Sequence, residues 1–139
     1  MALITAVKTG NWSDPTVWDS DPVLPGAGDT TECAGYVVAI DMDVEVAQMR
    51  SSGAGYYAVV AAPRAIIADV LSNVGHSGSA VVRCSHATGT VTISGTVQAG
   101  PRRGLDNNGT GTVEITTATG GTGSNAYGVC NAGTGTVNV

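Results

Sequence analysis

The chain contains no phenylalanine, and charged residues make up only 12% of its 139 residues. Long helix-forming side chains such as leucine, glutamate and lysine are scarce, whereas glycine occurs 20 times among many threonines, valines and alanines. β-Branched residues between glycines favour strands and tight turns over helices. We therefore expect an all-β protein.

Basic residues are also few, with six lysines and arginines spread along the chain and a net charge of −5. A nucleic-acid-binding surface needs clustered basic side chains to neutralise phosphates. Binding to an anionic membrane surface also needs clustered basic side chains. The longest apolar stretch, at 56–71, is interrupted by Pro63, Arg64 and Asp69. It is shorter than the roughly 20 apolar residues that span a bilayer. We expect neither nucleic-acid binding nor membrane insertion.

Paired cysteines are absent as well. Cys33, Cys84 and Cys130 form an odd set without Cys-x-x-Cys spacing, and neither His76 nor His86 completes the pattern of a zinc site. The sequence predicts free, buried thiols and no metal or other cofactor. The first ten residues do not resemble a secretory signal peptide, because the apolar run is about six residues long and Lys8 follows it. Synthesis in, and release into, a cytoplasm is the expectation.

The second half of the chain contains three similar phrases, at 82–93, 103–115 and 125–139. Their shared Thr-Gly pairs begin at Thr88, Thr110 and Thr134, so the steps are 22 and 24 residues. Repeats of this length indicate a solenoid, and alternating valine or isoleucine indicates half-buried strands. We predict a right-handed parallel β-helix with 22–24 residues per coil. Its aliphatic columns would be Val91, Val113 and Val137, and Ile93, Ile115 and Val139.

The same alignment predicts three further columns upstream of the Thr-Gly pair. They contain Arg83, Leu105 and Val129; Cys84, Asp106 and Cys130; and Ser85, Asn107 and Asn131. Coils stack at about 4.8 Å. Cys84 and Cys130, two coils apart, would therefore be about 9–10 Å from each other, which is too far for a disulfide. Asn107 and Asn131 would form an amide ladder.

The domain prediction divides the chain at residue 62. Residues 1–62 form a β-rich capping and attachment segment with strands at 36–41 and 43–49, and residues 63–139 form the coils. The apolar run 62–73 fits either a strand or a short helix. Val139 falls on an inward position of the last strand, where an open coil would expose unpaired backbone. We expect the natural chain to continue with further coils.

Two stretches resemble known proteins. "GNWSDPTVW" (10–18) followed by "VLPGAGDT" (23–30) resembles the opening of many large extracellular and phage β-helical proteins, and is similar to the start of the G8 domain. The coils, such as "GVCNAGTGTVNV" (128–139), resemble the Gly/Thr/Asn-rich β-helices of phage tail fibres, tailspikes and bacterial adhesins. These resemblances cover about residues 9–41 and 82–139. They imply a structural virion protein, commonly a homotrimer.

Two groups in the first segment are candidate binding residues. Trp12 and Trp18 could form a sugar-stacking pair, but filling the open end of the first coil is the favoured interpretation. Four carboxylates could bind Ca²⁺. Their spacing matches no known calcium loop, and they are ordinary turn formers. They are Asp14, Asp19, Asp21 and Asp29.

The coils offer little for catalysis. Glycoside hydrolysis needs two carboxylates roughly 5–9.5 Å apart across a groove, and the three repeats contain only Asp106 and Glu114, with Arg102 and Arg103 nearby. A solvated surface is the preferred interpretation of these residues. The stretch 120–128 lacks the lysine and the strand–loop–helix context of a phosphate-binding loop. The sequence therefore predicts no catalytic residue.

The functional expectation is a structural virion protein, comprising the N-terminal attachment and shaft region of a phage tail fibre or tailspike involved in host adhesion. Its expected partners are copies of itself, other virion proteins bound through residues 1–62, and cell-surface polysaccharide. It would be assembled in the host cytoplasm and reside in the virion. One alternative is a polysaccharide-degrading β-helix enzyme, a tailspike depolymerase or lyase, whose active site lies outside this segment. A bacterial surface adhesin is the other.

Overall fold

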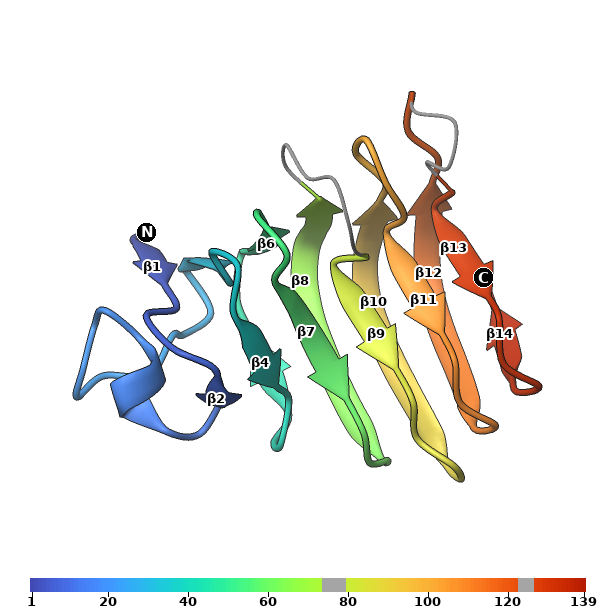
Figure 1. Cartoon of the computed structure of the whole chain (residues 1–139), viewed down its shortest axis with the longest axis horizontal. Coiled ribbons are helices and arrows are strands. Elements are labelled where there is room, and N and C mark those ends of the chain that lie inside the picture. Colours follow the sequence, from blue (N-terminus) through green and yellow to red (C-terminus); the bar gives the residue numbers. More distant parts are fainter. Residues whose placement is uncertain (74–79, 123–126) are drawn as a thin grey trace.

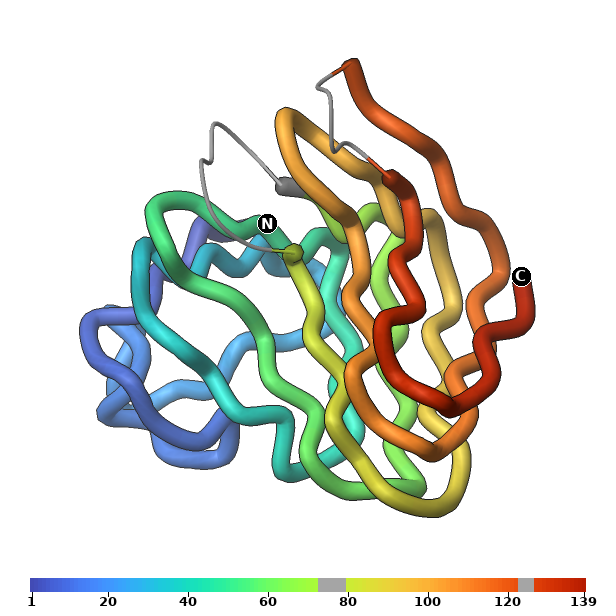
Figure 2. Tube along the Cα trace, turned by 45° about the vertical axis from the view of Figure 1, so that its right-hand side comes forward, coloured from blue at the N-terminus to red at the C-terminus, as the bar shows by residue number. Residues whose placement is uncertain are grey.

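A computed structural model describes residues 1–73, 80–122 and 127–139. It is a β-solenoid of about five turns, and its paired strands are all parallel. The coils stack along one axis from the N-terminus to the C-terminus (Figures 1 and 2). The one helical element in the described ranges is the short 3-10 turn η1 (Pro15–Val17). The predicted parallel β-solenoid is confirmed.

Two sheets form the walls of the solenoid. The eight-stranded sheet contains β1 (Leu3–Thr5), β3 (Thr30–Glu32), β6 (Gln48–Ser51), β8 (Arg64–Asn73), β10 (Thr90–Gln98), β12 (Thr112–Thr119) and β14 (Thr136–Asn138), with β5 (Val44–Glu45) pairing with β8. The six-stranded sheet contains β2 (Gly10–Asn11), β4 (Val37–Ala39), β7 (Tyr56–Val59), β9 (Val82–Cys84), β11 (Leu105–Asn107) and β13 (Val129–Asn131).

The aliphatic columns lie where the repeat predicts them, except that Val139, the predicted third member of the second column, follows the end of β14 and is 71% exposed. Val91 pairs with Val113, and Val113 with Val137. Ile93 pairs with Ile115 in the same strands. Val91, Ile93 and Val113 are fully buried between the sheets. Because burying such a side chain contributes about 1.5–3 kcal/mol, these columns are a main source of the stability of the coils.

The columns predicted upstream of the Thr-Gly pair are wrong by one residue between the first and second repeats. Leu105 pairs with Val82, Asp106 with Arg83, and Asn107 with Cys84. The predicted alignment of Arg83 with Leu105, Cys84 with Asp106 and Ser85 with Asn107 is therefore wrong. The columns between the second and third repeats are confirmed. A shift of one residue moves a side chain to the opposite face of a strand, so Cys84 is buried inside whereas Cys130 is partly exposed.

The cause of the shift is one extra residue in a turn. Residues 85–89 connect β9 to β10, whereas the shorter stretch 108–111 connects β11 to β12. The longer turn contains His86, whose ring is fully buried with Nε2 3.0 Å from the carbonyl oxygen of Thr112. A Cβ on Gly111 would lie 2.3 Å from Cδ2 of His86. The histidine therefore occupies space that only a glycine in the next coil leaves open.

The N-terminal segment belongs to the same stack. β1, β3 and β6 continue the eight-stranded sheet, and β2, β4 and β7 continue the six-stranded sheet. The strands predicted at 36–41 and 43–49 correspond to β4 and to β5 with the start of β6. The ambiguous run 62–73 is the strand β8, not a helix. The proposed boundary at residue 62 remains a prediction, and both sheets extend on either side of it.

β10 bends at Gly95. The register with β8 and with β12 shifts beside this residue, and its φ is +136°. A Cβ at Gly95 would lie 1.6 Å from the carbonyl oxygen of Ala68. A bulge of this kind bends a strand locally, and here it allows the long strands β8, β10 and β12 to follow the outline of the coil.

Candidate functional site

The two tryptophans are inside the first coils. Trp12 and Trp18 have only 2% and 1% of their surface exposed, and their rings meet edge to face with centroids 4.8 Å apart. The Trp18 indole N–H donates to the carbonyl oxygen of Trp12 at 3.1 Å. Tyr57 lies next to them, with its ring centroid 6.1 Å from that of Trp12. The core-filling interpretation is confirmed, and the sugar-stacking interpretation is wrong because the ring faces are covered.

The N-terminal carboxylates hold turns together. Asp14 accepts from the hydroxyl of Thr16 at 2.6 Å and from its backbone N–H at 2.9 Å, and these bonds lower the pKa of the Asp14 carboxyl. Asp29 accepts from Gly26 N and Ala2 N, which lowers its pKa likewise. Asp19 accepts from Thr5 N at 3.0 Å. Within the described ranges, no group of three or more His, Cys, Asp or Glu residues is placed to hold a metal ion.

The two acids of the three repeats do not face one groove. Asp106 lies on β11 of the six-stranded sheet and is buried, with 6% of its surface exposed. Glu114 lies on β12 of the eight-stranded sheet and is exposed between the buried residues Val113 and Ile115. Both side chains point outward, each from a different sheet. They therefore cannot flank a common glycosidic bond.

Asp106 instead joins two arginines. Arg103 donates from Nη1 to Asp106 Oδ1 at 3.0 Å, and this hydrogen bond and the carboxylate charge raise the pKa of Arg103. Arg83 is directly opposite Asp106 on β9, with Nε 3.9 Å from Oδ2. The arginine side chains retain 33% exposure at Arg83 and 37% at Arg103, compared with 9% for Asp106. The carboxylate is therefore covered, while the side chains of Arg83 and Arg103 remain partly exposed, although Nε of Arg83 is buried.

Tyrosines accompany both arginines. The Arg83 Cζ lies 4.3 Å from the centre of the Tyr56 ring, within the range of a cation–π interaction. The carbonyl oxygen of Tyr127 accepts at 3.0 Å from the N–H of Gly104, the residue after Arg103, and 55% of the Tyr127 surface is exposed. We call these five residues the arginine–tyrosine face: Tyr56, Arg83, Arg103, Asp106 and Tyr127. They lie on or beside β7, β9, β11 and β13 (Figure 1).

Sequence reasoning did not find this face. Its members are spread over residues 56–127, and only the strand register brings Arg83 opposite Asp106. The predicted alignment paired Arg83 with Leu105, one position away. A signal was present in the charge distribution, because residues 1–69 hold nine of the eleven acidic residues but only three of the six basic ones. Net charge is therefore −6 in that part and +1 in residues 70–139.

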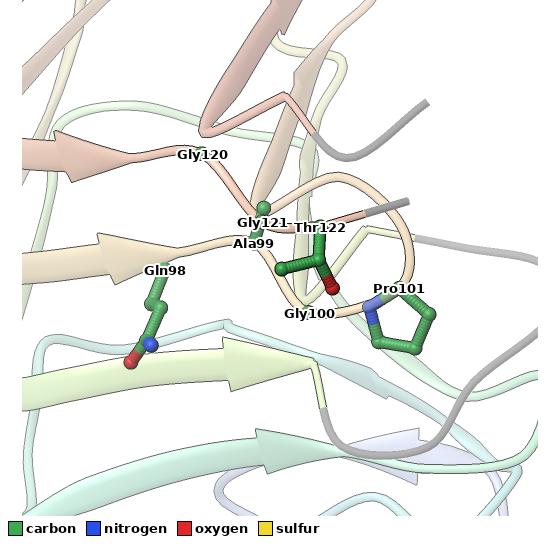
Figure 3. A pocket seen from close by; sticks show the side chains of 7 residues that line it. All are labelled: Gln98, Ala99, Gly100, Pro101, Gly120, Gly121 and Thr122. Carbon is green, nitrogen blue, oxygen red and sulfur yellow. The ribbon is translucent and has the colours of Figure 1, made fainter. Parts of the chain in front are cut away.

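The loops beyond β10 and β12 enclose a shallow hollow of about 360 Å³. Figure 3 shows its lining, which is Gln98, Ala99, Gly100, Pro101, Gly120, Gly121 and Thr122. The lining contains no ionisable side chain. A Cβ at Gly121 would lie 2.1 Å from the Gly100 carbonyl oxygen, so the two loops stack closely. Residues 123–126 of the glycine-rich stretch 120–128 are outside the described residues.

Among the described residues, the cysteines and His86 do not gather into a metal site. Burial raises the pKa of the Cys33 thiol and that of the Cys84 thiol to about 12, so both remain protonated. His76 is outside the described residues. Among the described residues, no helix has the length and apolarity needed to cross a bilayer. Comparison with known proteins finds no match among family models, curated proteins or solved structures.

Proposed function

We propose that this chain is a structural protein of a phage particle, forming the attachment and shaft region of a tail fibre or tailspike that takes part in host adhesion. The observation that carries the proposal is the pair of parallel sheets, which runs from β1 and β2 to β14 and β13 around one apolar interior. In such a stack the hydrogen bonds between strands run along the axis, an arrangement that suits a shaft extended by further coils.

The first coils support an attachment role. Trp12, Trp18 and Val17 are buried there, and η1 lies beside them with its N-cap at Asp14. This packing covers the N-terminal cross-section of the solenoid, which would otherwise expose apolar side chains. Surface residues around this buried cluster can contact another virion protein while the core stays covered. Homotrimer formation, implied by the resemblance to tail fibres, belongs to the same proposal.

The positions of the acids weigh against catalysis by this pair. Asp106 and Glu114 point outward from different sheets, and Asp106 is covered by Arg103 and Arg83. A depolymerase or lyase would need its carboxylates elsewhere. Conversely, the polar outer faces of the coils and their packed interior are what a shaft requires.

The experiment has two parts. Antibody raised against the chain is used to label tailed particles purified from the culture that carries the gene, and light scattering with negative-stain imaging gives the mass and shape of the purified protein. We expect label on the tail and a rod-shaped oligomer. Particles that contain the intact tail but no copy of the chain, by labelling and by mass spectrometry, would overturn the proposal.

A further inference from the structure

The arginine–tyrosine face combines groups that recognise one class of ligand. Its two guanidinium groups lie on either side of one carboxylate, so the cluster carries one excess positive charge. The face also lies in the part of the chain whose net charge is +1, whereas residues 1–69 carry −6. An anionic ligand would therefore be repelled by the first coils and attracted to this face.

We propose that the arginine–tyrosine face binds a carboxylated saccharide, at Arg83 and Arg103 with the help of the neighbouring tyrosines. The inference rests on the proposed role in host adhesion and names the chemistry of the surface that is recognised. It concerns the outer face of the six-stranded sheet.

Arg103 provides the first contact. A guanidinium has five N–H donors in a planar fork that matches a carboxylate. At Arg103 the Nη1 group donates to Asp106, and 37% of the side chain is exposed. The bond to Asp106 holds the fork in place, so less side-chain freedom is lost when a ligand carboxylate binds.

The second contact with the ligand comes from the tyrosines. Tyr127 supplies one ring, and Tyr56 supplies the other beside Arg83. Aromatic rings offer flat apolar surfaces with a polar group at one end, which suits the apolar face and the hydroxyls of a sugar ring. Tyr127 is 55% exposed, and its backbone is joined to Gly104, the residue after Arg103, by a hydrogen bond of 3.0 Å. The Tyr56 ring supports Arg83 at 4.3 Å. The outer face of the six-stranded sheet therefore presents charged and aromatic groups together.

The test compares two forms of one polysaccharide, with its carboxyl groups either free and ionised or methyl-esterified. Binding of the full chain to polygalacturonate and to its fully methyl-esterified form is measured by isothermal titration calorimetry at low and at high salt. We expect binding to the free acid, weakening with salt, and little binding to the ester. Arg103→Gln should weaken the binding about tenfold, because charged hydrogen bonds are lost. Tyr127→Ala, at an exposed position, should weaken it as well.

Arg50→Gln is the matched control, because it removes the same charge from β6 of the other sheet. It should change the affinity by less than about twofold. Thermal melting checks that each variant is folded, and Tyr127→Ala keeps the test valid if Arg103→Gln unfolds. Equal binding of acid and ester, equal loss in Arg50→Gln and Arg103→Gln, or no binding overturns the inference. A chain that labels the phage tail but does not bind polygalacturonate retains its structural role without this binding face.

Discussion

Asn107 and Asn131 are joined from one coil to the next, with the Asn107 amide nitrogen donating to the Asn131 side-chain oxygen at 3.0 Å. Asn107 is fully buried, and its own oxygen accepts from Gly109 N at 3.3 Å. Asn131 in turn donates to the carbonyl oxygen of Gly135 at 2.8 Å. The predicted amide ladder is confirmed. It connects the ends of β11 and β13 in successive coils and gives the buried Asn107 amide a partner.

Replacing Asn107 by alanine should destabilise the coils by about 1–3 kcal/mol, because buried donors and acceptors lose their partners. Urea denaturation followed by circular dichroism measures the change. Asn108→Ala is the control, since that side chain is exposed in the same turn, and its effect should stay within about 0.5 kcal/mol. Equal effects of the two substitutions would show that the ladder contributes nothing to stability.

Val113→Asp should unfold the coils. Val113 is fully buried in a column between Val91 and Val137, and an unpaired carboxylate there is strongly unfavourable. We expect loss of the cooperative thermal transition, measured by circular dichroism. Thr116→Asp, on an exposed position of the same strand, should leave the melting temperature nearly unchanged. A wild-type melting profile for Val113→Asp would contradict the column assignment.

Gly111→Ala should destabilise the protein by about 1–3 kcal/mol through overpacking, because the added methyl group meets the His86 ring. Part of this cost should disappear when His86 is also replaced by alanine, so a double-mutant cycle gives a measurable coupling energy. Gly28→Ala is the control, as no atom lies within 4 Å of its Cβ position. Strictly additive effects of Gly111→Ala and His86→Ala would refute the contact.

The Asp14 carboxyl should titrate below 3.8, its ordinary pKa, because the Thr16 hydroxyl and N–H bonds favour the charged form. A carboxyl whose pKa is lower in the folded state stabilises the fold above its ordinary pKa. That contribution is lost as the pH falls through the lower, folded value. The Thr16 amide chemical shift, followed by NMR between about pH 2 and 6, reports the midpoint.

Asp14→Asn is the comparison for that titration. The amide side chain can still accept a hydrogen bond at the N-cap but has no proton to gain, so the Thr16 shift should become nearly independent of pH over the same range. A midpoint at or above 3.8 in the wild-type protein would show that the cap bonds do not favour the carboxylate.

Part of the structure was decided locally and could be predicted. Side chains alternate along any strand, so the Val91, Val113 and Val137 pattern was enough to predict an aliphatic column and a coil of 22 residues. The scarcity of helix formers predicted an all-β chain. The Asn107–Asn131 ladder followed from the 24-residue step between the last two phrases, because the turns 108–111 and 132–135 are equally long.

The tertiary structure alone decided the remainder. The turn at His86 is one residue longer than the corresponding turn of the next coil. Side chains along a strand alternate between its two faces, so this extra residue places Cys84 on the inner face of β9, whereas the repeat alignment predicts inner positions for Arg83 and Ser85. It also brings Arg83 opposite Asp106. Likewise, the sequence placed Trp12 and Trp18 near each other but left open whether their ring faces bind sugar or fill the core. Packing against Tyr57 and the first coils decided that, because burial depends on contacts between residues far apart in the chain.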